Sequence, residues 1–232
     1  LGLYVVGLGI LATVRTTWAP SGADGSLGDQ FREGLAYVRT RPEMRLAFRL
    51  AFSVAGLGAV FAFSLAAGVA DDLFGRGGGG LGVLSTSLGV GSLLASAFIS
   101  GRGGRMSRAV LERRAILLYG AGLLVVASSS WLGVGMFGYL LTGAAHMLHG
   151  TTLSTALQLR VDEEFRGRVM SVFLVAILSG IPIGGLAFGI LGDLVGLRWV
   201  VLGAGLALCL DATVTGRRGA FALLDHEADV AG

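Results

Sequence analysis

Two histidines and a threonine within one long apolar segment are the residues whose type and spacing most favour chemistry in this chain. Thr142, His146 and His149 are related as i, i+4 and i+7, which places them on one face of a helix. Polar side chains are costly inside a membrane and mark substrate or ion pathways there. An imidazole can exchange hydrogen bonds with a substrate or titrate near neutral pH. We therefore predict that this face belongs to a substrate pathway and that His146, near the middle of the segment, faces a cavity.

Weaker candidates for the pathway are Ser53, in an earlier apolar segment, and Gln158, which follows the histidines toward the end of theirs. Hydroxyl side chains often bond back to a carbonyl of their own helix, which makes them less specific indicators. A histidine whose ring bonds to a neighbouring helix is the plainer alternative for His146. No Asp or Glu falls in the middle of a predicted apolar segment, so a proton-coupling group is expected to be His146 or to lie outside this chain.

The composition explains why these polar residues stand out. Hydrophobic residues make up 53% of the 232 positions, charged residues only 14%, and the mean hydropathy is +0.76. A bilayer core of about 30 Å requires roughly 20 apolar residues in a helix. Because backbone groups find no water there, only helices or closed barrels can span it. The long apolar runs exclude a barrel and predict an all-α integral membrane protein.

Six segments are predicted to cross the membrane as one bundle over residues 46–214. The sixth, Trp199 to Val214, is short and has Asp211 near its end. The other five approach or exceed the required length: Leu46 to Ala70, Leu81 to Ser100, Ala115 to Leu132, Val134 to Leu157 and Val169 to Leu191.

The arginines between these segments alternate between two sides of the membrane. Sixteen lie on one side, and Arg76 and Arg198 lie on the other. By the positive-inside rule the sixteen face the cytoplasm, together with the tail at residues 215–232. We therefore expect a multi-pass protein of the bacterial inner (plasma) membrane with a cytoplasmic C-terminus. Orientation accounts for the basic charge, and no nucleic-acid partner is expected.

The first 45 residues have a different character. Residues 1–14 are apolar but short, and they run into Arg15 without a preceding basic region, which is the opposite of a signal peptide. We interpret them as the end of a truncated transmembrane helix, so the chain is expected to be the C-terminal part of a longer protein; a short anchor is the alternative. Residues 15–45 are predicted to form a cytoplasmic linker, in which Phe31, Leu35 and Val38 give a surface helix its apolar face.

The loop before the fifth long segment combines both signs of charge. Asp162 and two glutamates precede Arg166, Gly167 and Arg168. We predict that these arginines pair with acidic groups on a neighbouring loop or cap helix C-termini in one conformation only, as a cytoplasmic latch. Orientation of the chain and contact with lipid headgroups are the alternative.

Glycines and a proline are concentrated in the segment that follows this loop. Gly180, Gly184 and Gly185 form a stripe that allows close helix packing. Pro182 removes a backbone hydrogen bond and is expected to kink the helix. This pattern is typical of helices that move during a conformational change, and an ordinary packing seam is the alternative.

Two stretches resemble the major facilitator superfamily, in the branch that includes the enterobactin exporter and related drug-efflux proteins. Phe31 to Arg39 is similar to the central linker of that branch. The loop Leu157 to Val169 is similar to its loop between helices 10 and 11, and Arg166 to Val169 is the most specific part. Asp162 stands where members of the family usually have Pro.

A third position matches the superfamily less closely. Gly101, Arg102 and Arg105 fall where its Gly-x-x-x-Asp-Arg motif lies between helices 8 and 9, but the Asp is missing here. The resemblance as a whole implies helices 7 to 12 of a twelve-helix transporter, preceded by the end of helix 6 and the linker. It implies three partners: membrane lipids, a small-molecule substrate and a missing N-terminal six-helix half.

The function implied by the resemblance is secondary active transport, with export of a drug or a siderophore-like molecule by alternating access. A lipid or lysophospholipid translocator, or a facilitator relative that does not transport, is the alternative. An intramembrane hydrolase is remote, because His146 and His149 precede the candidate nucleophiles Ser171 and Ser179 and the chain lacks a His-Glu-x-x-His motif. We expect no enzyme activity, no metal and no cofactor, with proton coupling as an open possibility.

Overall fold

The computed structural model describes residues 27–103 and 106–225, and within them the chain is helical and contains no strand. The predicted truncated helix at residues 1–14 and the predicted loop residue Arg105 lie outside this part of the chain. The elements in chain order are α2 (Leu27–Thr40), α3 (Pro42–Val54), η1 (Ala55–Ala59), α4 (Val60–Phe63), α5 (Ala66–Gly68), η2 (Val69–Leu73), α6 (Gly77–Gly101), α7 (Arg108–Ala127), α8 (Leu132–Arg160), η4 (Glu163–Phe165), α9 (Arg166–Val195), α10 (Leu197–Arg217) and η5 (Ala220–Leu224).

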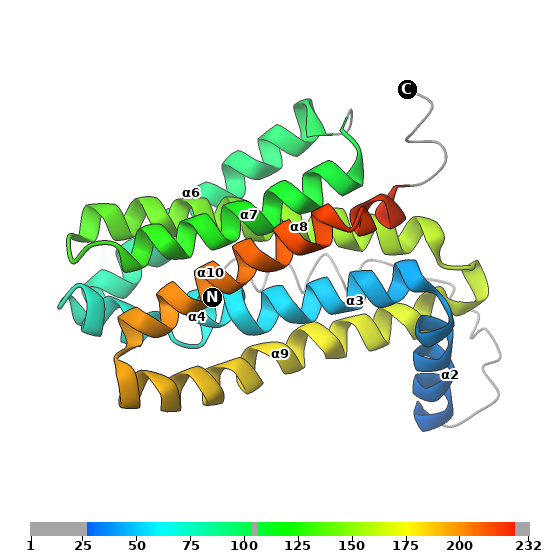
Figure 1. The fold of residues 1–232 in the computed structure, drawn as a ribbon, viewed down its shortest axis with the longest axis horizontal. Coiled ribbons are helices and arrows are strands. Elements are labelled where there is room, and N and C mark those ends of the chain that lie inside the picture. Colours follow the sequence, from blue (N-terminus) through cyan, green and yellow to red (C-terminus); the bar gives the residue numbers. More distant parts are fainter. Residues whose placement is uncertain (1–26, 104–105, 226–232) are drawn as a thin grey trace, which may run out of the picture.

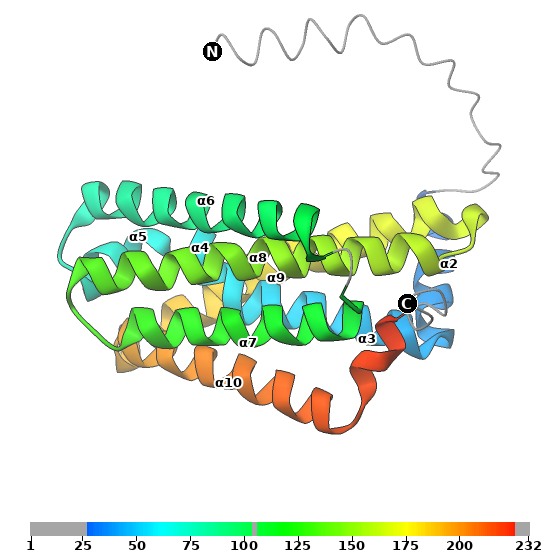
Figure 2. The ribbon, with the colours of Figure 1, turned by 90° about the horizontal axis from the view of Figure 1, so that it is seen from above.

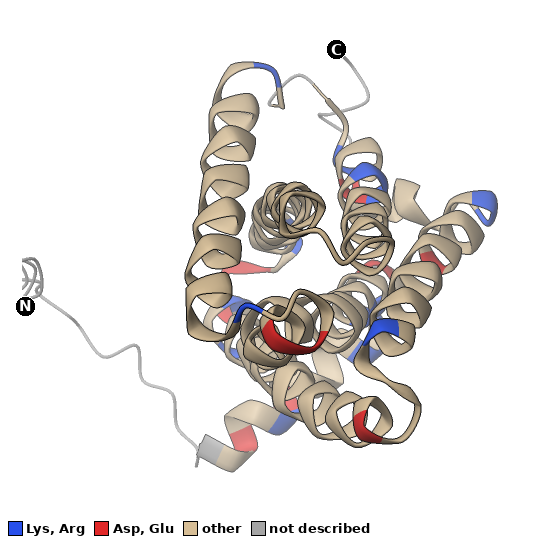
Figure 3. Ribbon diagram, turned by 90° about the vertical axis from the view of Figure 1, so that its left-hand side faces the viewer, with Lys and Arg blue, Asp and Glu red and all other residues tan. Residues whose placement is uncertain are grey.

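The long helices run side by side along one axis, and α2 lies across one end of the bundle (Figure 1). Helix α8 is central, because α6 and α7 both pack against it and α10 packs against α7 (Figure 2). Seen along the bundle, charged residues occupy short stretches of ribbon, and most of each long helix is uncharged (Figure 3). Such a distribution suits helices whose middle parts lie in hydrocarbon.

Within the described residues, four helices are long and apolar enough to cross a membrane. They are Pro42–Phe63, Gly77–Gly101, Glu163–Val195 and Leu197–Arg217. The other two predicted spans correspond to α7 and α8, which carry more polar residues. Helix α7 contains Glu112, Arg113 and Arg114 near its start, and the two histidines lie in α8. The structure therefore shows a multi-helix membrane protein with four spans that are clear from length and composition.

Helix α7 begins earlier than the predicted span at Ala115, and this difference changes the position of an acidic residue. Ser107 caps the helix, because its hydroxyl accepts a hydrogen bond from the backbone N–H of Val110 at 3.3 Å. The helix therefore includes Glu112, whose side chain is fully buried. The prediction that no acidic residue lies in the middle of a span still holds, because Glu112 is near the start of α7, but the Ser107 cap starts the helix before Ala115 and so brings Glu112 into the bundle.

The first predicted span, Leu46 to Ala70, is not one continuous helix. The backbone N–H groups of Ser64 and Leu65 both donate to the carbonyl of Val60, at 2.9 and 2.8 Å, and the helix ends there. A wider π-helical turn, η1, precedes this break. At this turn Gly58 lies against the ring of Tyr119, which would come within 2.7 Å of any Cβ at that position. Such turns often occur at functional sites.

Helix α2 buries a different face from the one that the sequence predicts. Gly34, Tyr37 and Val38 are buried, whereas Phe31 is 39% exposed. A Cβ on Gly34 would lie 2.9 Å from the carbonyl oxygen of Arg168, so the backbones of α2 and α9 approach closely here. The predicted apolar stripe of Phe31, Leu35 and Val38 is wrong in part, because the close approach at Gly34 rotates the contact face toward Tyr37.

Glycines bring the helices around α8 into backbone contact. A Cβ on Gly91 of α6 would lie 1.9 Å from the carbonyl oxygen of Leu140, and one on Gly143 of α8 would lie 2.0 Å from that of Leu88. Ser92 adds a hydrogen bond across the same contact, since its hydroxyl donates to the carbonyl of Gly143 at 3.0 Å. Small residues of this kind let membrane helices pack closely where burial of apolar area offers no gain.

The Gly91 contact yields a prediction about stability. Replacing Gly91 with Ala is expected to destabilise the folded protein by about 1–3 kcal/mol, because the new methyl group meets backbone atoms that cannot move independently. The Gly89→Ala variant is a matched control, since a Cβ at Gly89, in the same helix, has no atom within 4 Å. Thermal unfolding in detergent measures both variants, and equal melting temperatures for the two would contradict the packing argument.

Candidate functional site

The second half of α8 presents a polar face at the surface of the described bundle. This α8 polar face consists of His146, Gly150, Thr151, Ser154, Thr155 and Gln158. Most of these residues, together with Met147, line a concavity of about 410 Å³. Thr155 and Gln158 are exposed, and His146, Thr151 and Ser154 are partly buried. Hydroxyl, amide and imidazole groups along one helix face can accept and donate hydrogen bonds to a bound molecule.

His146 lies where α4, α7 and α8 meet. Its Nδ1 is 3.5 Å from the hydroxyl of Tyr119, and its ring centroid is 5.2 Å from that of Phe63. The same residue lines the concavity of the α8 polar face. The structure thus combines the two readings of His146 made from the sequence, because the ring contacts neighbouring helices on one side and reaches the concavity on the other.

Thr142 and His149 point away from this face. The hydroxyl of Thr142 donates to the carbonyl of Gly138, one turn earlier in its own helix, at 2.9 Å. The Nδ1 of His149 lies 2.7 Å from Oε1 of Glu112 on α7, and both side chains are buried. Thr142, His146 and His149 all lie on one broad side of α8. His146 reaches the concavity, whereas Thr142 and His149 are buried in the bundle.

Ser53 belongs to a separate polar contact between α3 and α10. Its hydroxyl lies 3.4 Å from Oδ2 of Asp211. Arg49 pairs with the same carboxylate and also donates to the hydroxyl of Thr215 at 2.7 Å. The structure therefore does not bring Ser53 to the α8 polar face. It uses Ser53 and Asp211, the acidic residue near the end of the sixth predicted span, to join two helices.

A polar cluster joins α2 to the loop between α8 and α9. The hydroxyl of Tyr37 donates to Oδ2 of Asp162 at 3.0 Å and accepts from the backbone N–H of Asp162 at 3.1 Å. Arg41 donates to the same carboxylate oxygen at 2.9 Å and lies over the Tyr37 ring, which stacks on Phe165. We call Tyr37, Arg41 and Asp162 the linker cluster.

Protonation equilibria reflect this arrangement. The Tyr37 hydroxyl and the Arg41 guanidinium hold the pKa of the Asp162 carboxyl below its usual value, because both donate to its charged form. Burial raises the pKa of Tyr37. Asp162 is therefore charged and Tyr37 neutral under ordinary conditions, and these are the forms in which the observed donors and acceptors match.

The remaining residues of the predicted latch fall into two groups. Arg168 pairs with Glu33 of α2 at 3.0 Å and lies near the Phe165 ring. Arg166 and Gly167 are exposed, and a Cβ on Gly167 would have no atom within 4 Å. In the loop between α6 and α7, Arg102 is exposed as well, at the C-cap of α6. Of the predicted latch residues, Asp162 and Arg168 therefore contact α2 or the residue after it, and Arg166 and Gly167 are exposed.

The glycine stripe of α9 packs against the first span. A Cβ on Gly180 would lie 2.8 Å from the Cβ of Ala55, and one on Gly184 would lie 2.5 Å from the carbonyl oxygen of Gly56. Gly185 lies against Ser64. Pro182 is exposed, and α9 is assigned as one helix on both sides of it. The glycines therefore contact the same region as the π-helical turn η1.

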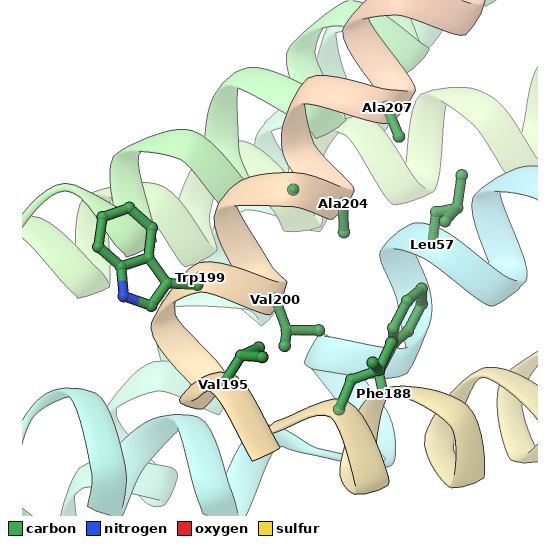
Figure 4. Close-up of a pocket in the computed structure, with 9 residues that line it drawn as sticks. Leu57, Phe188, Val195, Trp199, Val200, Ala204 and Ala207 are labelled. Carbon is green, nitrogen blue, oxygen red and sulfur yellow. The ribbon is translucent and has the colours of Figure 1, made fainter. Parts of the chain in front are cut away.

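A second concavity lies between the first span, α9 and α10, with a volume of about 310 Å³ (Figure 4). Leu57, Phe188, Val195, Val200 and Ala204 are among the apolar residues that line it, and Trp199 is also part of its wall. No charged side chain lines this concavity, so it suits an apolar group and offers no catalytic chemistry.

Several polar contacts were not predicted from the sequence. Glu112 lies among arginines in the sequence, and only the capping serine before α7 indicates that it is helical. Arg198 was assigned only to an outer loop. Its guanidinium donates to the carbonyls of Ala127 at 2.7 Å, Ser129 at 3.0 Å and Leu73 at 3.2 Å, and so joins three connections at one end of the bundle.

Comparison with protein families places the geometry in context. A family model described as transmembrane secretion effector matches residues 3–229. Comparison with curated proteins and with solved structures gave no match.

The linker cluster yields a prediction about pH. A carboxyl whose pKa is lower in the folded than in the unfolded state stabilises the fold above its unfolded value, near 3.9, and this contribution is lost as the pH falls through the folded value. At neutral pH, Asp162→Asn is therefore expected to speed hydrogen exchange of the α2 amides. Glu163→Gln is the control, since Glu163 is exposed in the same loop. The difference from the wild type is expected to shrink in acid, and equal exchange at neutral pH would refute the role of the Asp162 charge.

Proposed function

The chain belongs to the transmembrane secretion effector family of major facilitator transporters, and we propose that it forms part of a secondary transporter that exports a small molecule by alternating access. The observation that carries this proposal is the family match over residues 3–229, which includes every described helix. The fold is consistent with it, since a bundle of apolar helices presents one polar concave face.

We further propose six spans, with α7 and α8 as the third and fourth. At a rise of about 1.5 Å per residue, a 20-residue helix such as α7 is about 30 Å long, which equals the thickness of the hydrocarbon core. Helix α8, with 29 residues, is longer still. Helix α8 lies alongside α6 and α7 lies alongside α10, and α6 and α10 are apolar enough to span on their own (Figure 2). Polar residues of α7 and α8 such as Glu112, Thr142 and His149 are buried between helices and not exposed to lipid.

The α8 polar face is the proposed contact surface for the substrate. Transporter sites lie near the middle of the bilayer at the interface between two halves. His146 is near the middle of α8, and Thr151 and Ser154 extend the polar surface toward the arginine-rich end. A second six-helix half, packed against this face, would close the concavity around a bound molecule.

The orientation follows from the arginines. Those of α2, of the loop between α8 and α9, and of the end of α10 belong to the side with sixteen arginines, which we place in the cytoplasm of a bacterial cell. The C-terminus would then be cytoplasmic. The linker cluster and the Glu33–Arg168 pair would lie on the cytoplasmic surface, where α2 would act as the linker between two halves.

Within the superfamily we favour the branch of the enterobactin exporter and drug-efflux proteins. The loop Leu157 to Val169 and the linker stretch Phe31 to Arg39 support this assignment. In the structure these two stretches are in contact through Tyr37 and Asp162, and through Glu33 and Arg168. The substitution of Pro by Asp162 supplies the carboxylate of that contact, which a Pro does not offer.

A lipid or lysophospholipid translocator is the second candidate function. The observation that favours it is the apolar concavity between the first span, α9 and α10, which is large enough for part of an acyl chain (Figure 4). A translocator also needs a polar path for the headgroup. The α8 polar face is formed by another helix, so the export of a small molecule remains the better-supported proposal.

Transport is tested with the complete protein in everted membrane vesicles from an efflux-deficient bacterial host. We expect energised vesicles to accumulate at least one compound from a panel of amphiphilic dyes and a catechol siderophore. Accumulation of fluorescent lysophospholipid without that of the dyes would favour the translocator instead. No transport of either kind would overturn the proposed function.

The α8 polar face predicts which variants impair transport. His146→Ala and Ser154→Leu are expected to lower the rate roughly tenfold or more, because each removes or blocks a polar contact in the concavity, and one lost hydrogen bond to substrate is worth about 1–2 kcal/mol. Thr213→Ala is the control, because that hydroxyl bonds to the carbonyl of Cys209 within α10. Equal losses in all three variants would show that the α8 polar face has no special role.

The orientation predicts which positions react from each side. After replacement of Cys209 by Ser, a cysteine introduced at exposed Arg166 is expected to react with a membrane-impermeant maleimide only in everted vesicles. A cysteine at exposed Arg76, at the other end of the bundle, is expected to react in intact cells. The reverse pattern would invert the proposed topology.

A further inference from the structure

We propose that Glu112 and His149 form a proton-binding site inside the bundle, one turn along α8 from His146, which lines the concavity of the α8 polar face. The binding of a proton by the pair does not depend on the proposed function. The coupling of that proton to transport rests on the proposed function.

Burial and geometry single out this pair. The Glu112 side chain is 0% exposed and that of His149 is 7% exposed, and Oε1 of Glu112 lies 2.7 Å from Nδ1 of His149. The second carboxylate oxygen, Oε2, is buried and has no hydrogen-bond partner among the described residues. Other polar contacts of the bundle are different, since the Asp211 carboxylate is partly exposed and pairs with the permanently charged Arg49.

The charge of the pair explains why it would bind a proton. With His149 neutral and Glu112 ionised, the pair carries one negative charge and an unsatisfied oxygen on buried side chains, which is unfavourable. One added proton makes the pair neutral as a whole, whether it is an ion pair or a hydrogen-bonded acid and imidazole. An imidazole is the group that takes up and releases a proton near neutral pH.

The concavity of the α8 polar face lies one turn along α8 from the pair. His146 is one turn before His149 on the same helix, lines the concavity, and has its Nδ1 3.5 Å from the hydroxyl of Tyr119. A proton that the pair takes up binds to the Nε2 of His149, where a new N–H bond forms. The proton between Nδ1 and Oε1 stays within the pair, and release reverses the transfer.

The ionisable groups of the neighbouring elements do not replace the pair. On α7, Arg108 lies one turn before Glu112 and lines a small concavity of about 120 Å³ with Thr152 of α8. Arg113, the next residue after Glu112, lies against Gly216 of α10. Helix α6, on the other side of α8, has no ionisable side chain from Gly77 to Gly101.

The elements beyond α6 and α7 hold their charged groups in other contacts. Arg49 of α3 pairs with Asp211 of α10. After α10, the Asp225 carboxylate accepts a hydrogen bond from the backbone N–H of Ala109 at 2.9 Å. Tyr139 of α8 donates to the carbonyl of Phe61 at 2.7 Å. None of these carboxylates lies in the position of Glu112 between α7 and α8.

Proton binding is measured on the purified chain in detergent by difference infrared spectroscopy over a pH titration. The wild type is expected to show a coupled carboxyl and imidazole step that Glu112→Gln loses. Asp211→Asn is the matched control, because it removes a carboxylate that pairs with an arginine, and it is expected to keep the step. An unchanged step in Glu112→Gln would overturn the proposal.

A second variant keeps the test decisive if Glu112→Gln does not fold, which thermal unfolding will show. His149→Gln retains the carboxylate and removes the titrating ring, and it is expected to shift the carboxyl band and abolish the imidazole part of the step. The same carboxyl band and the same titration as in the wild type would overturn the proposal.

Transport then separates coupling from proton binding. In vesicles that contain the complete protein, Glu112→Gln is expected to lose the acceleration that a pH gradient gives, while exchange without a gradient persists. Acceleration equal to that of the wild type would overturn coupling through Glu112 and leave the proposed function intact. A wild type that titrates but transports nothing would overturn the proposed function and support the proton site.

Discussion

The close approach of helix backbones at glycine is the constraint on which the rest of this structure depends. In a bilayer, lipid chains are as apolar as leucine side chains, so burying apolar area does little to hold helices together, and contacts at van der Waals distance must do it. At Gly91 and Gly143 the backbones of α6 and α8 leave no space for a methyl group. Gly122 and Gly138 do the same between α7 and α8, since a Cβ on either would lie within 3.0 Å of a carbonyl oxygen of the other. Helix α8 is therefore fixed between two neighbours.

Fixing α8 in this way divides its polar residues between two environments. The face that meets α7 encloses His149, which then requires a partner, and Glu112 supplies it. The adjacent face stays open, and there Thr151, Thr155 and Gln158 are free of the tight glycine contacts. His146 lies at the boundary and touches both. His149 of α8 and Glu112 of α7 thus form a buried pair inside the bundle, and α8 presents a row of hydroxyl groups to a concavity.

The charged ends of the bundle follow a different rule, because water and lipid headgroups are present there. At one end Arg198 satisfies three backbone carbonyls of the connections around it. At the other end Tyr37, Arg41 and Asp162 fasten α2 to the loop between α8 and α9. The α2 contact joins residues that are 121 to 125 positions apart in the chain. A shift of the loop before α9 would therefore change the contacts of α2.

The sequence by itself determined that this is a helical membrane protein, because the length of an apolar segment is set by the thickness of the bilayer and requires no knowledge of neighbours. It also identified His146 as a residue of interest, because a polar group is costly in that position whatever surrounds it. The tertiary structure alone decided which polar groups meet. Glu112 is hidden among arginines until a Ser107 cap starts its helix and the packing of α7 on α8 encloses it. Likewise Tyr37, and not Phe31, became the contact of α2, since the rotation of a helix depends on where a neighbour's backbone approaches closely, here at Gly34. Hydropathy is a property of each segment, whereas contact is a property of pairs of segments, and only the folded chain specifies the pairs.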